Sequence, residues 1–193
     1  MIMERNTNIF SCEPIEGGFS YSITSRLGNI LHYAEKLFGE RNKDYTLLGV
    51  ELIDRDYPQI WFPCNCGNIV IQITIDCLND MDEAIFQVAH ECVHCLCPTI
   101  GKHATILEEG LATWFSVHYT RLHNINKKPQ TQNYQDACCL VSQLLEYDLG
   151  LIKKARKQSP NISDITIGLL MNICPNINPY LANELTKPFE YNR

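Results

Sequence analysis

The pattern of apolar residues divides the chain into an early part that contains strands and a later part made of helices. From residue 22 apolar side chains recur every three or four positions, which predicts a helix that ends at Gly39. Residues 46–53 and 59–62 are rich in aliphatic and aromatic side chains and predict strands. Residues 68–76 carry isoleucine at every second position, which predicts a strand most clearly.

A second helix is predicted to begin after Asp80. Asp80 suits the N-cap position, and Glu83 three residues later completes a capping-box pattern. The apolar positions that follow recur at helical spacing: Ile85, Val88, Ala89, Cys92 and Leu96. We expect this stripe to be buried, which would hold the polar face of the helix in a fixed direction.

A third helix is predicted from residue 106. Residues 105–108 read Thr-Ile-Leu-Glu and match a second capping box, in which the Glu108 carboxylate reaches back to the backbone of Thr105. This interpretation leaves Glu109 free for another role. Gly110 costs about 1 kcal/mol relative to alanine inside a helix, so we expect it to allow close packing of this helix against the second one.

Beyond residue 124 the pattern becomes helical. A polar loop is expected at residues 126–133. Helices are predicted at residues 134–149, 151–158, 164–173 and 180–186. The basic run at residues 153–157 is interpreted as a solvated helix face or a helix end.

This order of elements predicts an α+β fold in one domain that spans residues 1–193. About residues 20–124 would form an amino-terminal helix, a small mixed sheet and two central helices, and about residues 134–190 would form a helical part. The hydrophobic fraction of 45% and the charged fraction of 20% are typical of a globular domain with an ordinary core.

Residues 90–94 read His-Glu-Cys-Val-His, an H-E-x-x-H pattern on the second helix. Four residues turn a helix by about 400°, so His90 and His94 lie on one face and can converge on one ion. Glu109 follows His94 by 15 residues and is the expected third ligand. Three protein ligands and one open position are typical of catalytic zinc. Glu91, rotated by about 100° from His90, is the expected general base.

Residues 107–112 read Leu-Glu-Glu-Gly-Leu-Ala and resemble the L-N-E-G-F-A segment of the gluzincin metallopeptidases. That clan includes thermolysin-like enzymes and related aminopeptidases. The resemblance covers about residues 80–120. The chain differs from the large members in a shorter gap between the histidines and the glutamate, and in Glu108 where they have asparagine.

The resemblance implies a zincin-like fold with a central H-E-x-x-H helix. It implies one zinc ion held by His90, His94 and Glu109, with Glu91 as the catalytic base. The strand at residues 68–76 is then either the edge strand, which would pair with an extended substrate, or an ordinary interior strand.

Zinc peptidases use a further side chain to stabilise the negatively charged oxygen of the reacting carbonyl. Tyr119, Tyr134 and Tyr147 are the candidates, and residues 134–149 form the helix expected to cover the site. His118 is disfavoured, because it lies on roughly the opposite helix face from the presumed ligand.

Charge and cysteine content restrict the partners and the compartment. The formal net charge of −6 gives no support to nucleic-acid binding. No stretch is long and apolar enough for a membrane span, and the first residues do not form a secretory signal. The ten cysteines match no paired C-x-x-C zinc pattern, so we expect reduced thiols and a cytoplasmic location.

The leading hypothesis from the sequence is a zinc-dependent endopeptidase that acts on a protein or peptide substrate, with a regulatory protein as a further partner. A first alternative is a non-catalytic zincin-like domain that serves as a binding or sensor module. A second alternative is a metal-dependent hydrolase that acts on a different bond.

Overall fold

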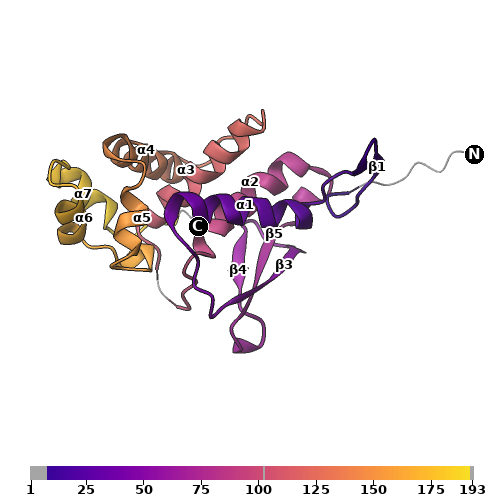
Figure 1. The fold of residues 1–193 in the computed structure, drawn as a ribbon, viewed down its shortest axis with the longest axis horizontal. Helices are drawn as coiled ribbons and strands as arrows, with labels where there is room; N and C mark the ends of the chain where they lie inside the picture. The colour runs from indigo at the N-terminus through magenta and orange to yellow at the C-terminus, as the bar shows by residue number, and fades with distance from the viewer. Residues whose placement is uncertain (1–7, 102, 192–193) are drawn as a thin grey trace, which may run out of the picture.

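The computed structural model describes residues 8–101 and 103–191, which combine helices with two small sheets (Figure 1). The mixed helix and strand content agrees with the predicted α+β class. The strands are β1 (Pro14–Ile15), β2 (Gly18–Phe19), β3 (Thr46–Ile53), β4 (Gln59–Trp61) and β5 (Asn68–Thr74). The helices are α1 (Ile23–Phe38), α2 (Met81–His94), α3 (Ile106–Leu122), α4 (Gln132–Tyr147), α5 (Leu151–Arg156), α6 (Ile167–Ile173) and α7 (Pro179–Leu185). Short 3-10 turns occupy Pro63–Asn65, Ile75–Asn79 and Ile162–Asp164.

The main sheet has the order β3-β5-β4, with β3 parallel and β4 antiparallel to β5. The hypothesis that residues 68–76 form an edge strand is therefore wrong. β5 pairs on both sides and ends at Thr74, where the chain turns into the 3-10 segment. Alternation of side chains shows that a strand has two different faces, but it does not show how many strands lie beside it.

One face of the sheet is apolar, and the other combines polar residues with apolar ones such as Val70 and Trp61. Ile69, Ile71 and Ile73 are buried and join the core with residues of α1 and α2. On the other face Gln59 Nε2 donates to Gln72 Oε1, and Gln72 Nε2 donates to Glu51 Oε1, each at 2.6 Å. These two hydrogen bonds join the amides of Gln59 and Gln72 to the Glu51 carboxylate across all three strands, so they help to hold the sheet together.

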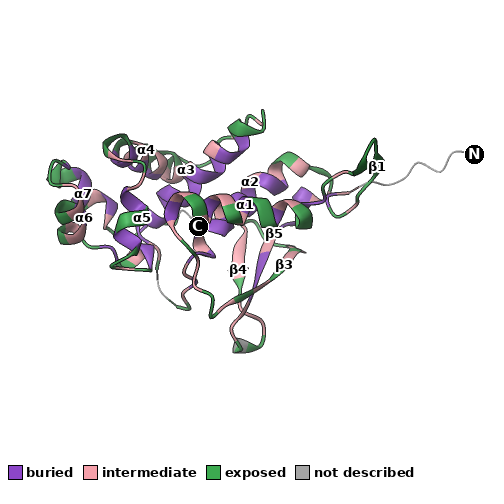
Figure 2. Ribbon diagram, viewed as in Figure 1, coloured by how far each residue is buried: buried purple, intermediate pink, exposed green. Residues whose placement is uncertain are grey.

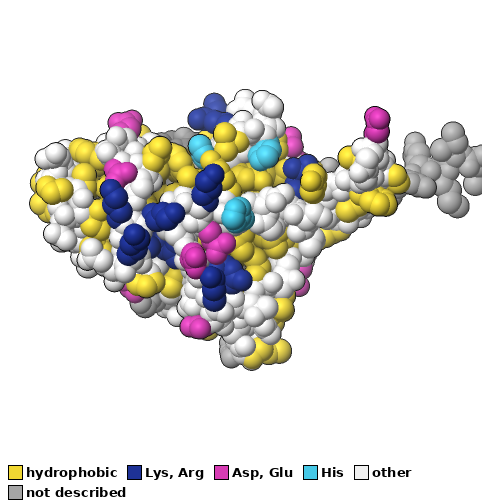
Figure 3. All heavy atoms as spheres, viewed as in Figure 1, with side chains coloured by type: hydrophobic (Ala, Val, Ile, Leu, Met, Phe, Trp, Pro, Cys, Tyr) yellow, Lys and Arg dark blue, Asp and Glu magenta, His cyan; other side chains and the backbone are white. Residues whose placement is uncertain are grey.

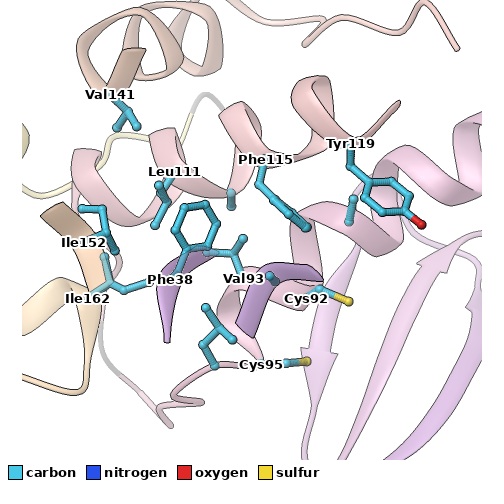
Figure 4. Packing of buried hydrophobic residues seen from close by; sticks show 14 of the residues in the cluster. Phe38, Cys92, Val93, Cys95, Leu111, Phe115, Tyr119, Val141, Ile152 and Ile162 are labelled. Carbon is cyan, nitrogen blue, oxygen red and sulfur yellow. The ribbon is translucent and has the colours of Figure 1, made fainter. Parts of the chain in front are cut away.

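α3 lies between α2 and α4 and is buried on nearly every side, as Figure 2 shows along its length. Figure 4 shows Phe115, Leu111 and Phe38 meeting in the centre of the core. Cys92 and Cys95 are buried there, and burial raises the pKa of both thiols. None of the described cysteines forms a disulfide bond. None of the described helices is both long and apolar enough to cross a membrane.

α5 to α7 pack beyond the ends of α1 and α3. Figure 3 shows Lys and Arg side chains gathered over α5 and the end of α1. The basic run at residues 153–157 lies at the end of α5, as predicted, but Arg156 is not solvated, because it is buried. Its guanidinium donates to the carbonyl oxygens of Phe38 at 2.9 Å, Gly39 at 2.7 Å and Leu96 at 3.1 Å. Arg156 thus holds the end of α1 close to the end of α2.

Candidate metal centre

The two histidines of the H-E-x-x-H pattern lie next to each other on α2. Asp80 caps this helix, as predicted, by accepting a hydrogen bond from the Glu83 backbone at 2.9 Å. The Glu83 carboxylate does not complete the predicted capping box, because it pairs with Gln87 and Lys127. The predicted apolar stripe of α2 is buried against α1, α3 and the sheet. His90 Nε2 and His94 Nε2 lie 3.2 Å apart on the remaining face. The rigid backbone of a packed helix therefore positions both imidazoles.

The first turn of α3 places Glu109 beside the histidines. Glu109 Oε2 lies 3.1 Å from His90 Nε2 and 3.7 Å from His94 Nε2. A tetrahedral zinc ion with ligands at about 2.0–2.1 Å requires its ligand atoms to be about 3.3–3.4 Å apart. The three observed separations of 3.1, 3.2 and 3.7 Å are close to this value. The predicted set His90, His94 and Glu109 can therefore hold one metal ion.

Glu108 does not complete the capping box predicted for it. Thr105 does cap α3, because its hydroxyl accepts from the Glu108 backbone at 3.4 Å. The Glu108 carboxylate instead lies 2.8 Å from His94 Nδ1 and accepts a short hydrogen bond from Ser163 Oγ. The backbone N–H of Thr105 donates to Ser163 Oγ at 2.9 Å, whereas the predicted capping box would have the Glu108 carboxylate as its acceptor. A carboxylate on the outer nitrogen of a metal-binding imidazole fixes its tautomer and direction.

Glu91 is 4% exposed on the same helix as the histidines. Burial raises the pKa of its carboxyl, and the charges of His94 and His90 lower it again in part. The negative charges of Glu109 and Glu108 raise the pKa of Glu91 further. A buried carboxylate with a raised pKa beside a metal site has the properties of a general base.

Charge distribution across the cluster favours an ionised Glu109. Burial by itself raises the pKa of this carboxyl, but the charge of His94 and the hydrogen bonds from His90 and His94 outweigh burial and hold the pKa well below its usual range. Burial lowers the pKa of His94, whereas Glu109 and Glu108 raise it by more, so that its net shift is upward. Two carboxylates around one imidazole thus prepare a site for a cation.

Of the three tyrosines predicted as candidates to stabilise the oxyanion, only Tyr134 has a contact with a residue of the candidate metal centre. The Tyr134 ring meets the His90 ring edge-on, with centroids 5.7 Å apart. Burial and the charges of Glu109 and Glu91 raise the pKa of Tyr134, which keeps its hydroxyl protonated. Tyr119 instead packs against Tyr33, about 15 Å along α3 from Glu109.

Tyr147 and His118 lie away from the cluster. Tyr147 is 13 residues beyond Tyr134, or about 20 Å along α4, and is 44% exposed. His118 stacks on Trp114, and its Nε2 lies 3.1 Å from the Tyr33 hydroxyl. The expectation that His118 points away from the metal ligands is confirmed.

Gly110 allows close packing as expected, but against a different helix. A Cβ atom at this position would lie 2.5 Å from the carbonyl oxygen of Ala137 and 2.7 Å from Val141 Cγ2, both on α4. The helices α2 and α3 do pack together, but the prediction that Gly110 serves this packing is wrong. The glycine brings α4, which carries Tyr134, close to the helix that carries Glu109.

Sequence reasoning missed two residues that support the candidate metal centre, one through Glu108 and one through the ligand Glu109. Ser163 donates to Glu108, and the Tyr191 hydroxyl donates to Glu109 Oε1 at 2.7 Å. Neither residue belongs to a motif, and they lie 55 and 82 residues from their partners along the chain. No local pattern in the sequence could have identified them.

Comparison with known proteins identifies no relative. No family model matches the chain, and neither the curated proteins nor the solved structures contain a match. The functional argument therefore depends on the geometry of His90, His94 and Glu109 and on the residues that surround them.

Proposed function

We propose that this chain is a zinc-dependent endopeptidase. The observation that carries the proposal is the cluster of His90 Nε2, His94 Nε2 and Glu109 Oε2 at separations of 3.1 to 3.7 Å, with the buried Glu91 on the same helix. Two imidazoles and one carboxylate are the ligand set of catalytic zinc in several peptidases. The gluzincin resemblance of residues 107–112 supports the same assignment.

The proposed chemistry needs a Lewis acid, a base and a proton donor. Zinc, when bound, would polarise the scissile carbonyl and lower the pKa of a water molecule to about 7. Glu91 would accept the proton of the attacking water and pass it to the leaving amine. The protonated hydroxyl of Tyr134 is the nearest candidate to donate a hydrogen bond to the developing oxyanion.

Substrate would bind along β4 in this proposal. β4 is the edge strand on one side of β5 and contacts α2, which carries the histidines. An extended peptide can add to such an edge through backbone hydrogen bonds. Trp61 at the end of β4 is 50% exposed and offers an apolar contact for a substrate side chain.

A second candidate is the non-catalytic binding or sensor module. Structural zinc sites are closed, whereas catalytic sites keep an open position. The side chains of His90, His94 and Glu109 are only 13%, 16% and 5% exposed, which favours a closed site. The buried Glu91 favours catalysis, because a purely structural site has no use for a base.

One experiment separates the two candidates. Purified protein should contain about one zinc ion per chain, and it should cleave a library of unfolded peptides, with the new ends identified by mass spectrometry. Glu91→Gln should keep the zinc and reduce cleavage by about 10²–10⁴-fold. Glu146→Gln, an exposed glutamate on α4, is the matched control and should cleave at the parent rate.

The two candidates predict different results for these variants. Zinc at full occupancy with no cleavage by the parent chain would favour the binding module. Equal cleavage by the parent chain and Glu91→Gln would mean that Glu91 is not the base. Cleavage of an ester or amide library without cleavage of peptides would favour a different hydrolase.

We also infer a reducing compartment such as the cytoplasm. Cys12, Cys64, Cys66 and Cys139 are exposed free thiols, and exposed thiols persist where cellular reductants keep them reduced. When the protein is alkylated in denaturant at cell lysis, which exposes the buried thiols as well, mass spectrometry should find all ten cysteines modified.

A further inference from the structure

Residues 187–191, which follow α7, return to the start of the ligand helix α3. The Ile106 backbone N–H donates to the Lys187 carbonyl oxygen, and the Phe189 N–H donates to the Ala104 carbonyl oxygen, both at 2.9 Å. Thr105 and Pro188 form an antiparallel bridge between these two bonds. The segment is therefore fixed by its backbone to the residues that precede Glu109.

Two side chains of α4, those of Asn133 and Tyr134, also contact residues 187–191. Phe189 is 6% exposed, and its ring lies 4.9 Å from the Tyr134 ring and 5.0 Å from the Tyr191 ring. Asn133 Nδ2 donates to the Glu190 carbonyl oxygen at 2.7 Å. Residues 187–191 thus bridge the first turns of α3 and α4, and Tyr191 lies over the metal centre.

The two oxygen atoms of Glu109 have different partners. Oε2 faces the imidazoles, at 3.1 Å from His90 Nε2. Oε1 accepts the hydrogen bond from the Tyr191 hydroxyl at 2.7 Å. An ionised carboxylate can only accept, so the Tyr191 hydroxyl is the donor in this contact.

We propose that Tyr191 is a positioning residue that holds Glu109 to the metal through a single oxygen atom. A hydrogen bond to an ionised acceptor is stronger than one between neutral groups. Outer partners that orient ligands in this way typically contribute 10–100-fold to metal affinity. This inference depends on the metal centre of the proposed function but not on peptide hydrolysis.

The test compares zinc affinities by competition with a coloured chelator. Tyr191→Phe keeps the ring and removes only the hydroxyl, and it should bind zinc about tenfold more weakly. Tyr180→Phe is the matched control, because Tyr180 on α7 is 69% exposed, and it should bind zinc as the parent does. Both variants should unfold at the parent temperature in excess chelator, which shows that the loss concerns the metal and not the fold.

Cobalt(II) provides an independent readout of ligand geometry. Its visible absorption weakens when a second carboxylate oxygen joins the coordination sphere. Tyr191→Phe frees Glu109 Oε1, so its cobalt spectrum should be weaker than that of the parent chain, whereas the spectrum of Tyr180→Phe should match the parent. An unchanged affinity and spectrum in Tyr191→Phe would overturn the inference.

A double variant tests whether the segment acts through the tyrosine. Asn133→Ala removes one attachment of residues 187–191 and should weaken zinc binding by less than Tyr191→Phe does. The double variant should bind zinc as weakly as Tyr191→Phe alone, because both changes act on one contact. If the two losses in zinc affinity added up in the double variant, residues 187–191 would not act on the metal through Tyr191. A parent chain that binds no zinc would overturn the metal centre as well, whereas parental affinity in Tyr191→Phe overturns only the role of Tyr191.

Discussion

Gly110→Ala should destabilise the protein, although alanine is the better helix former. The added methyl group would lie 2.5 Å from the Ala137 carbonyl oxygen and 2.7 Å from Val141 Cγ2. The nearer atom belongs to the backbone of α4, so no side-chain rotation can relieve the contact. The two helices must separate, and the core between α3 and α4 must open.

The magnitude follows from these distances. Ordinary contact begins at 3.4 Å, so α4 has to move by about 0.9 Å, the difference between 3.4 and 2.5 Å. Overpacking costs about 1–3 kcal/mol, and a 2.5 Å approach to a backbone atom belongs to the upper part of this range, about 2–3 kcal/mol. Alanine recovers up to about 1 kcal/mol through helix propensity. We expect a net loss of about 1–2 kcal/mol in the free energy of unfolding, which corresponds to about 2–8 °C in the melting temperature.

Gly28→Ala is the matched control. Gly28 is an exposed glycine inside α1, and a Cβ atom there would meet no other atom within 4 Å. This variant should therefore gain about 0.4–1 kcal/mol. Both glycines lie in helix interiors, so both substitutions gain helix propensity. A gain in the free energy of unfolding for Gly28→Ala and a loss for Gly110→Ala would therefore isolate the packing cost at Gly110.

Urea denaturation followed by far-ultraviolet circular dichroism measures both variants. The slope of the unfolding free energy with urea should stay at the parent value, and only the midpoint should move. A Gly110→Ala variant as stable as the parent chain, or more stable, would refute the claim that α3 and α4 are in close backbone contact. A shift of α4 would also move Tyr134 relative to His90, so cleavage should fall in this variant and not in Gly28→Ala.

Four further substitutions test the site and the sheet. Glu108→Ala should weaken zinc binding by about 10–100-fold, because His94 loses the carboxylate that orients it, and Ser163→Ala should weaken it less; chelator competition measures both, and parental affinity in Glu108→Ala would contradict this role. Tyr134→Phe should reduce kcat by about 10²–10³-fold with little change in KM if its hydroxyl stabilises the oxyanion, which steady-state kinetics on one identified peptide would show. Gln72→Pro should prevent folding, because β5 pairs on both sides and loses ladder hydrogen bonds; a folded, zinc-loaded variant would contradict the central position of β5.

Features that depend on neighbouring residues could be predicted from the sequence. The limits of α1, the Asp80 and Thr105 caps and the buried stripe of α2 follow from helical periodicity and capping chemistry, which act over a few residues. The convergence of His90 and His94 follows from the same helical geometry. Glu109 was predicted because the residues around it resemble a known ligand segment.

Features that depend on distant residues required the tertiary structure. The alternation of residues 68–76 is the same for a central strand as for an edge strand, so only the pairing with β3 and β4 decided the position of β5. Gly110 indicated close packing, but the chain path decided that α4 is the neighbour.

The contacts that support the candidate metal centre also join residues that are distant in the sequence. Glu108 matched a local cap, yet a histidine 14 residues before it and a serine 55 residues after it became its partners. Tyr191 reaches Glu109 across 82 residues. Helical periodicity sets which way a side chain points, whereas the partner that it meets depends on how the segments pack, and packing is a property of the whole folded chain.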